Sequence, residues 1–61
     1  MNIKKIRETA MLTQPEFAEE LGVSFRTIQS WEQGKCKPSL RHRRIIVAFC
    51  NTHKIDLGEQ R

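Results

Sequence analysis

Apolar residues recur along the chain at spacings of three and four, the period of an α-helix. The first such run places Ile3, Ile6 and Ala10 on one face, behind Asn2, whose side chain suits an N-cap. This pattern predicts a first helix that ends near residues 11–12. The β-branched residues are scattered and do not alternate over a useful length, so we expect no strands.

A clear helix start follows in residues 13–16, which have the sequence Thr-Gln-Pro-Glu. This is a capping box with proline in the first turn, where no intrahelical N–H is needed. Phe17, Ala18 and Leu21 form the apolar stripe of this second helix. Gly22 then ends the helix, because glycine tolerates the positive φ of a helix stop.

Only residues 22–24 separate this helix from the next one. Ser24 suits an N-cap, Ile28 and Trp31 share one face, and the pair at 33–34, Gln-Gly, ends the third helix. Two short helices joined by a three-residue turn that contains glycine form the helix-turn-helix pattern. A small residue is needed where the two helices cross, and Ala18 occupies that position.

A fourth helix is expected to begin after Ser39 and to fray over residues 51–54. The residues predicted to face inward on it are Ile45, Ile46, Phe49 and Cys50. We expect Ile55 and Leu57 to fold back onto the core. The fold class predicted is therefore all-α, with four short helices in one domain over residues 1–57, the motif at 14–33 and a mobile C-terminal tail at 58–61.

The chain has 61 residues, enough for one domain with a thin core. Its two cysteines, Cys36 and Cys50, lack the spacing of a zinc site, and we expect free thiols rather than a disulfide. No apolar run suggests a signal peptide or a membrane span, which favours the cytoplasm. No metal or cofactor is expected.

Charge is unevenly distributed along the chain, whose net charge is +4. The acids gather at Glu16, Glu19 and Glu20, whereas residues 35–44 hold five Lys or Arg and no acid. A basic domain of this kind is consistent with nucleic acid or with an anionic membrane surface. The asymmetry favours one edge that binds an anionic partner.

Residues 3–40 resemble the phage repressor and Cro-like helix-turn-helix family, chiefly through the segments at 12–24 and 31–39. The resemblance implies a sequence-specific regulator of transcription, a repressor, that binds double-stranded DNA with its third helix in the major groove. Such domains usually act as one half of a dimer on a palindromic operator. The chain ends too soon for the family's fifth helix, so a homodimer and a monomer both stay open.

Base contacts are assigned from helix geometry. If Ile28 and Trp31 face the core, the residues presented to DNA are Phe25, Arg26, Gln29 and Ser30. Arg26 is the principal predicted base contact, because arginine can pair with guanine through two hydrogen bonds. Gln29 could pair with adenine, and Phe25 could pack against a thymine methyl group. The alternatives are an ordinary solvated helix face and, for Phe25, partial burial against the second helix.

Contacts to DNA phosphates are expected from polar and cationic residues around the third helix. They are Gln14, Ser24, Thr27, Lys35, Lys37, Arg41 and Arg44. Gln14 begins the second helix, where backbone N–H groups can also meet a phosphate, and the resemblance implies the same role. Cations in the first turn of the fourth helix oppose the helix dipole, which an anionic partner would offset. A solvated basic face is the alternative.

The resemblance also implies an ion pair between Arg7 in the first helix and Glu32 at the end of the third. Such a pair would lock the third helix in place, although desolvation offsets part of its attraction.

Other functions are less well supported. No nucleophile and base, carboxylate pair or phosphate-binding glycine loop indicates an enzyme or a small-molecule substrate, and His42 and His53 suit a surface role. The main alternative is an antitoxin or adapter that uses this fold to bind a partner protein. RNA binding ranks third, because no aromatic platform for bases is expected.

Overall fold

The computed structural model describes residues 1–55, and this part of the chain contains helices and no strand. The helices are α1 (Ile3–Thr9), α2 (Gln14–Leu21), α3 (Phe25–Glu32) and α4 (Leu40–His53). The predicted all-α fold is confirmed. The expectations for Leu57 and for a mobile tail at 58–61 lie outside the described residues.

Each helix begins at the residue that the sequence predicts as its N-cap. The side chains of Asn2, Thr13, Ser24 and Ser39 all accept a hydrogen bond from the backbone N–H three residues later. At α2 the Glu16 carboxylate also accepts from the backbone N–H of Thr13 at 2.9 Å, which completes the capping box. These bonds satisfy N–H groups that have no partner within the helix, and so they fix where each helix starts.

The helix ends agree less closely with expectation. Gly22 ends α2 with φ of 73°, as predicted. α1 ends at Thr9, before the expected residues 11–12, and Met11 has φ of 61° on the turn into α2. α4 stays helical to His53, with Lys54 as its C-cap, so it continues through most of residues 51–54, where we expected fraying.

The core lies where the inward faces of the four helices meet. Its buried residues are Ile3, Ile6, Phe17, Ala18, Leu21, Ile28, Trp31, Ile46, Phe49 and Cys50. The rings of Phe17 and Phe49 meet edge to face with centroids 5.2 Å apart, joining α2 to α4. Ile55 packs against this core, as expected.

Ile45 is not part of the core, and this prediction was wrong. It is 36% exposed, whereas the next residue, Ile46, is fully buried. Successive residues differ in direction by about 100° on an α-helix, and the buried face of α4 is centred on Ile46, between Phe49 and Cys50, so Ile45 falls at the edge of that face. The buried positions 46, 49 and 50 set the inward direction of α4.

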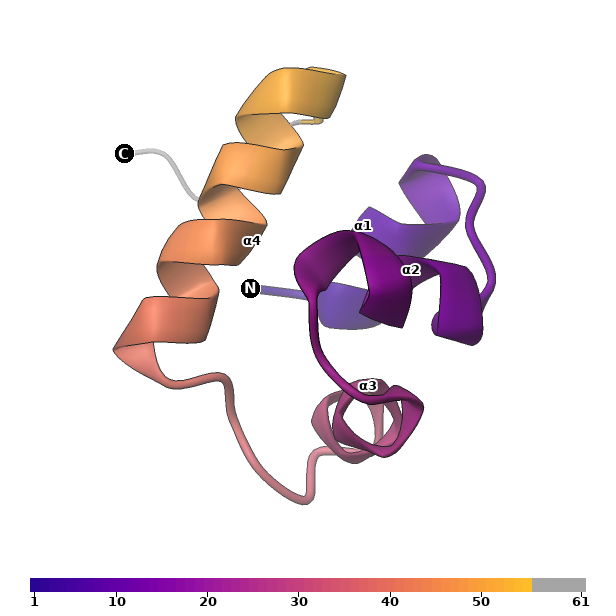
Figure 1. Ribbon diagram of the computed structural model, residues 1–61, viewed down its shortest axis with the longest axis vertical. Helices are drawn as coiled ribbons and strands as arrows, with labels where there is room; N and C mark the ends of the chain where they lie inside the picture. The colour runs from indigo at the N-terminus through magenta and orange to yellow at the C-terminus, as the bar shows by residue number, and fades with distance from the viewer. Residues whose placement is uncertain (56–61) are drawn as a thin grey trace.

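The helices form two parts in Figure 1. The three short helices gather on one side, and α4 stands beside them. The loop that joins α3 to α4 lies at the same end of the molecule as α3. The basic residues of this loop therefore lie at the end of the molecule that carries the third helix.

Candidate nucleic-acid interface

The outer face of α3 is the centre of the candidate interface. Ile28 is fully buried and Trp31 is 8% exposed, so one side of the helix is anchored in the core. Arg26 on the other side is exposed, while Gln29 and Ser30 are half-buried. The four residues predicted to contact bases thus include two, Phe25 and Arg26, that are open to solvent at the first turn of the helix.

Phe25 does not pack into the interior. It is 44% exposed, so the alternative of a side chain buried against α2 does not describe the structure. The Arg26 side chain has no hydrogen bond or ion pair with any other residue in the described part of the chain. Its guanidinium donors are therefore available to a ligand.

The turn before α3 holds Ser24 and Thr27 in mutual contact. Their hydroxyl oxygens are 2.8 Å apart, and the Thr27 backbone N–H donates to the Ser24 oxygen at 3.1 Å. The contact of either residue with a phosphate stays a prediction. The Ser24 oxygen already takes part in two hydrogen bonds and the Thr27 hydroxyl in one, so any contact with a phosphate would use the remaining hydrogen-bonding capacity.

An ion pair ties α1 to the end of α3. Arg7 Nε donates to Glu32 Oε2 at 2.7 Å, and Arg7 Nη2 donates to Glu32 Oε1 at 3.2 Å. Arg7 Nη1 also donates to the carbonyl of Leu12 at 2.9 Å. The side chains of Arg7 and Glu32 are only 14% and 6% exposed. The pair implied by the family resemblance is therefore present, and the same arginine also fixes the turn between α1 and α2.

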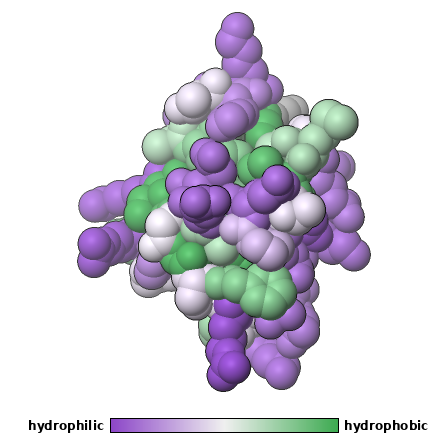
Figure 2. All heavy atoms as spheres, turned by 45° about the vertical axis from the view of Figure 1, so that its right-hand side comes forward, coloured by the Kyte–Doolittle hydropathy of each residue, from purple (hydrophilic) through white to green (hydrophobic). Residues whose placement is uncertain are grey.

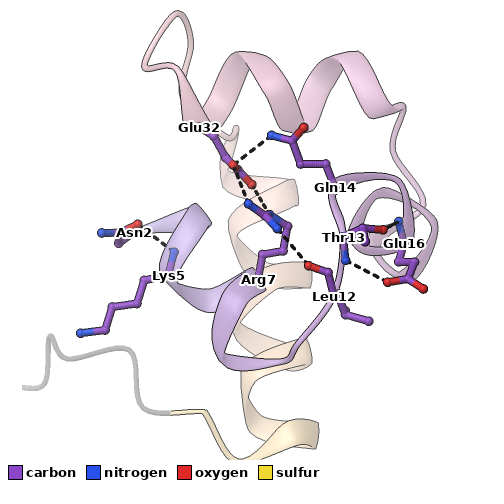
Figure 3. A network of polar contacts seen from close by, with 8 residues as sticks. All are labelled: Asn2, Lys5, Arg7, Leu12, Thr13, Gln14, Glu16 and Glu32. Carbon is purple, nitrogen blue, oxygen red and sulfur yellow. Dashed lines mark hydrogen bonds and ion pairs between the residues drawn. The ribbon is translucent and has the colours of Figure 1, made fainter.

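Gln14 joins this network, which sequence reasoning missed. Its Nε2 donates to Glu32 Oε1 at 3.0 Å, linking the first residue of α2 to the last residue of α3 (Figure 3). No local pattern relates two residues 18 positions apart. The expected phosphate contact of Gln14 stays a prediction, and it would have to use the second amide hydrogen or the backbone N–H.

The network controls the charge of Glu32. Burial acts to raise the pKa of this carboxyl, but hydrogen bonds from Arg7 and Gln14 and the positive charges of Arg7 and Lys4 outweigh it. The net result is a pKa below the ordinary value of 4.5. Glu32 therefore stays ionised and keeps its partners near neutral pH.

The cations after α3 surround the loop and the start of α4. Lys35, Lys37, Arg41 and Arg44 are all exposed, as a phosphate-binding edge requires. Arg43, which was not among the residues predicted to contact phosphates, lines a surface pocket of about 440 Å³ together with Lys37 and Trp31. These cations form no ion pair with a carboxylate among residues 1–55.

Gln33 is a further exposed polar residue near the outer face of α3, and the sequence analysis did not include it among the predicted DNA contacts. It is exposed at the C-cap of α3, seven positions after Arg26. Residues seven apart lie on nearly the same side of a helix, so the period of α3 itself could have identified Gln33.

The surface agrees with a polar binding role. On the face shown in Figure 2, hydrophilic residues predominate and hydrophobic residues form separate islands. Within residues 1–55, no helix is long and apolar enough to cross a membrane. Over the same residues, no group of three or more His, Cys, Asp or Glu side chains could hold a metal ion. Cys36 is exposed and Cys50 buried, both as free thiols.

Comparison with known proteins decides the family. The profile of the helix-turn-helix family matches residues 3–57, nearly the whole chain. The chain belongs to the helix-turn-helix family. The predicted kinship with phage repressors and Cro-like proteins is thereby confirmed, and the chain is a DNA-binding helix-turn-helix domain.

One curated relative extends the comparison. The domain is 42% identical over 53 residues to the type II methyltransferase M.SsoII of Shigella sonnei. The match covers 82% of this chain but 14% of the methyltransferase, so the domain corresponds to a small part of that protein. No solved structure matches the chain.

Proposed function

We propose that the domain is a sequence-specific repressor of transcription that inserts α3 into the major groove of DNA. The observation that carries this proposal is the free, exposed Arg26 on a helix whose opposite side is anchored by Ile28 and Trp31. A rigid helix with an unpaired guanidinium can donate two hydrogen bonds to O6 and N7 of guanine.

Affinity would come from the cations near α3. Lys35, Lys37, Arg41 and Arg44 are exposed, so phosphates can approach them without rearrangement of the fold. Phosphate contacts of this kind fix the position of the protein on the duplex, whereas contacts to base edges select the sequence. Repression would follow if the selected sequence overlaps a promoter.

The proposal is tested by selecting bound sequences from a library of random DNA duplexes at moderate salt. We expect an enriched sequence, and a palindrome would indicate that two copies bind together. Failure to enrich any sequence would overturn the proposal. A promoter that carries the enriched sequence should then be transcribed less in the presence of the protein, whereas activation would contradict the repressor assignment.

A partner-binding antitoxin or adapter is the alternative function. It calls for an exposed apolar patch, and α4 does expose Leu40 at 62% and Ile45 and Val47 at 36% each. Four polar residues, at 41–44, separate Leu40 from Ile45 along the helix and include Arg41 and Arg44, which favours DNA over an apolar partner surface. We further infer that the domain acts by binding and not by catalysis, and the activity of the methyltransferase relative is not carried over to it.

A further inference from the structure

The surface pocket of about 440 Å³ lies where the start of the chain meets the loop between α3 and α4. Figure 1 shows the start of the chain between α4 and the short helices, so segments far apart in the sequence meet here. None of the four residues predicted to contact bases lines this pocket. The residues that line it are Met1, Ile3, Trp31, Gly34, Cys36, Lys37, Pro38 and Arg43.

The charged side chains of this pocket are both positive. Lys37 lines it from the loop and Arg43 from α4, and no Asp or Glu is among the lining residues. Neither cation has an ion pair or a side-chain hydrogen bond within residues 1–55. A second pocket, of about 230 Å³ against α4, is the opposite case, since it is lined by Glu20 and by no Lys or Arg. The larger pocket therefore favours an anion.

The floor of the larger pocket is apolar and already formed. Ile3 and Trp31 are only 6% and 8% exposed, and both belong to the core. The Trp31 ring also meets His42 edge to face, with centroids 5.4 Å apart, which helps to hold it in place. A ligand can thus contact these side chains without opening the fold, as is usual for small-molecule sites of about 300–1,000 Å³.

An apolar floor with two cations at its side selects one class of ligand. A carboxylate accepts hydrogen bonds from guanidinium and ammonium groups, and an aromatic body removes apolar surface from water against Trp31 and Ile3. A bare inorganic anion would leave the floor in contact with water, and a neutral apolar compound would leave the cations unused. At roughly 30 Å³ per water molecule, the space holds a body of about 10–15 non-hydrogen atoms.

From these observations we infer that the pocket binds a small aromatic carboxylate and that this ligand competes with DNA. Lys37 is common to both partners, because it lines the pocket and is also expected to contact a phosphate. A bound carboxylate engages Lys37 and adds a negative charge beside the DNA backbone. Ligand and DNA then weaken each other's binding by the same factor. Binding to the pocket is independent of the proposed function, whereas the competition rests on it.

The test of binding titrates the full, ¹⁵N-labelled chain with cinnamate and 2-naphthoate, and in parallel with their neutral amides. Trp31 is the single tryptophan of the chain, so its indole N–H gives one signal. We expect the carboxylates to shift this signal and the amide signal of Cys36, with dissociation constants of about 1 mM, typical of small fragments. The neutral amides should bind about fivefold more weakly. The signals of Ala48 and Thr52, beside the second pocket, should not move.

Arg43→Gln should weaken the binding of the carboxylates about threefold and leave the neutral amides unaffected, because only the carboxylate uses the charge. Arg43→Lys keeps the charge and should keep most of the affinity. Arg41→Gln is the matched control, since it makes the same change in net charge at an exposed position of α4 that does not line the pocket. Circular dichroism verifies that each variant is folded.

The competition is measured by fluorescence anisotropy with a labelled duplex of arbitrary sequence at low salt, because phosphate contacts do not depend on sequence. Cinnamate at a saturating concentration should weaken duplex binding about threefold. Acetate at the same concentration is the control for ionic strength, since it carries the charge without the aromatic body, and it should have little effect. The effect of cinnamate should be smaller in Arg43→Gln.

The outcomes separate the inference from the proposed function. An unmoved Trp31 signal, or equal affinity for the carboxylates and their amides, overturns the inference. Cinnamate that binds in the pocket but leaves duplex binding unchanged also overturns it, because the two partners then do not share Lys37. Failure of the selection to enrich any sequence overturns the proposed function alone, since none of these measurements requires a specific site.

Discussion

At the scale of single residues, the functional prediction concentrates on side chains that the fold leaves without internal partners. Arg7 and Arg26 illustrate the contrast. Arg7 uses its donors on Glu32 and Leu12, whereas Arg26 has none of its donors engaged in the described part of the chain. The first therefore serves the fold and the second is free to serve recognition.

Arg26→Ala should relax the preference for one base at one position of the selected site. The expected loss is about 1–3 kcal/mol of discrimination against the wrong base, because the two hydrogen bonds to guanine are removed. Competition binding with all four base pairs at that position measures it. Arg26→Lys is the control, since it keeps the charge but lacks the planar fork. An unchanged preference in Arg26→Ala would remove Arg26 from the set of base contacts.

Glu32 should make stability depend on pH in acid. Its folded pKa lies below the ordinary 4.5, so its contribution to the free energy of unfolding is present above 4.5 and is lost as the pH falls through the folded value. The stability difference between the wild type and Glu32→Gln should therefore shrink between pH 7 and about pH 3. Urea denaturation at each pH measures the difference. Glu19→Gln, a change at an exposed position of α2, should show no such shrinkage.

At the scale of helices, short stretches of sequence decide where each helix begins and ends. The four N-caps bond to backbone N–H groups three residues ahead, and Gly22 supplies the left-handed backbone at the end of α2. Because Gly22 opens the turn between α2 and α3, it also affects the angle at which α3 leaves the core.

Gly22→Ala should destabilise the domain by about 1–2 kcal/mol, the cost of a left-handed conformation for an L-residue. The cost is conformational, since φ is 73° and a Cβ at this position would meet no other atom within 4 Å. Thermal denaturation should show a midpoint lower by about 4–8 °C for each kcal/mol. Gly22→Asn should lose less, because asparagine adopts this conformation more readily. Equal stability of both variants and the wild type would contradict this explanation.

At the scale of the whole molecule, the arrangement of α3, its following loop and the start of α4 determines how much charge can meet DNA. The loop and α3 lie at the same end of the molecule (Figure 1). Each DNA phosphate that a cation of the protein neutralises releases counterions. The number of phosphate contacts therefore sets how steeply the binding constant falls with salt concentration.

Lys37→Gln should weaken binding to all sequences alike and reduce the slope of log K against log salt by about 0.9, the value for one phosphate contact. Filter binding or fluorescence anisotropy at several salt concentrations measures the slope. Lys5→Gln is the control, because the Lys5 side chain points away from the Gln14 and Glu32 network in Figure 3. A slope that changes equally in both variants would indicate a general charge effect and no specific contact at Lys37.

The sequence by itself determined the helices, the turn and the family. Thr13, Ser24 and Ser39 start helices through bonds that span three residues, and an apolar period of three to four identifies the buried face of each helix. These interactions are local, so the order of residues is sufficient to predict them.

Tertiary structure decided the features that depend on how the helices cross. The bond between Gln14 and Glu32 joins residues 18 apart in the chain, and its existence depends on where α2 and α3 meet. The exposure of Phe25 likewise depends on whether a neighbouring helix covers it. No period or cap encodes these distances, because they arise from the packing of several helices around one core.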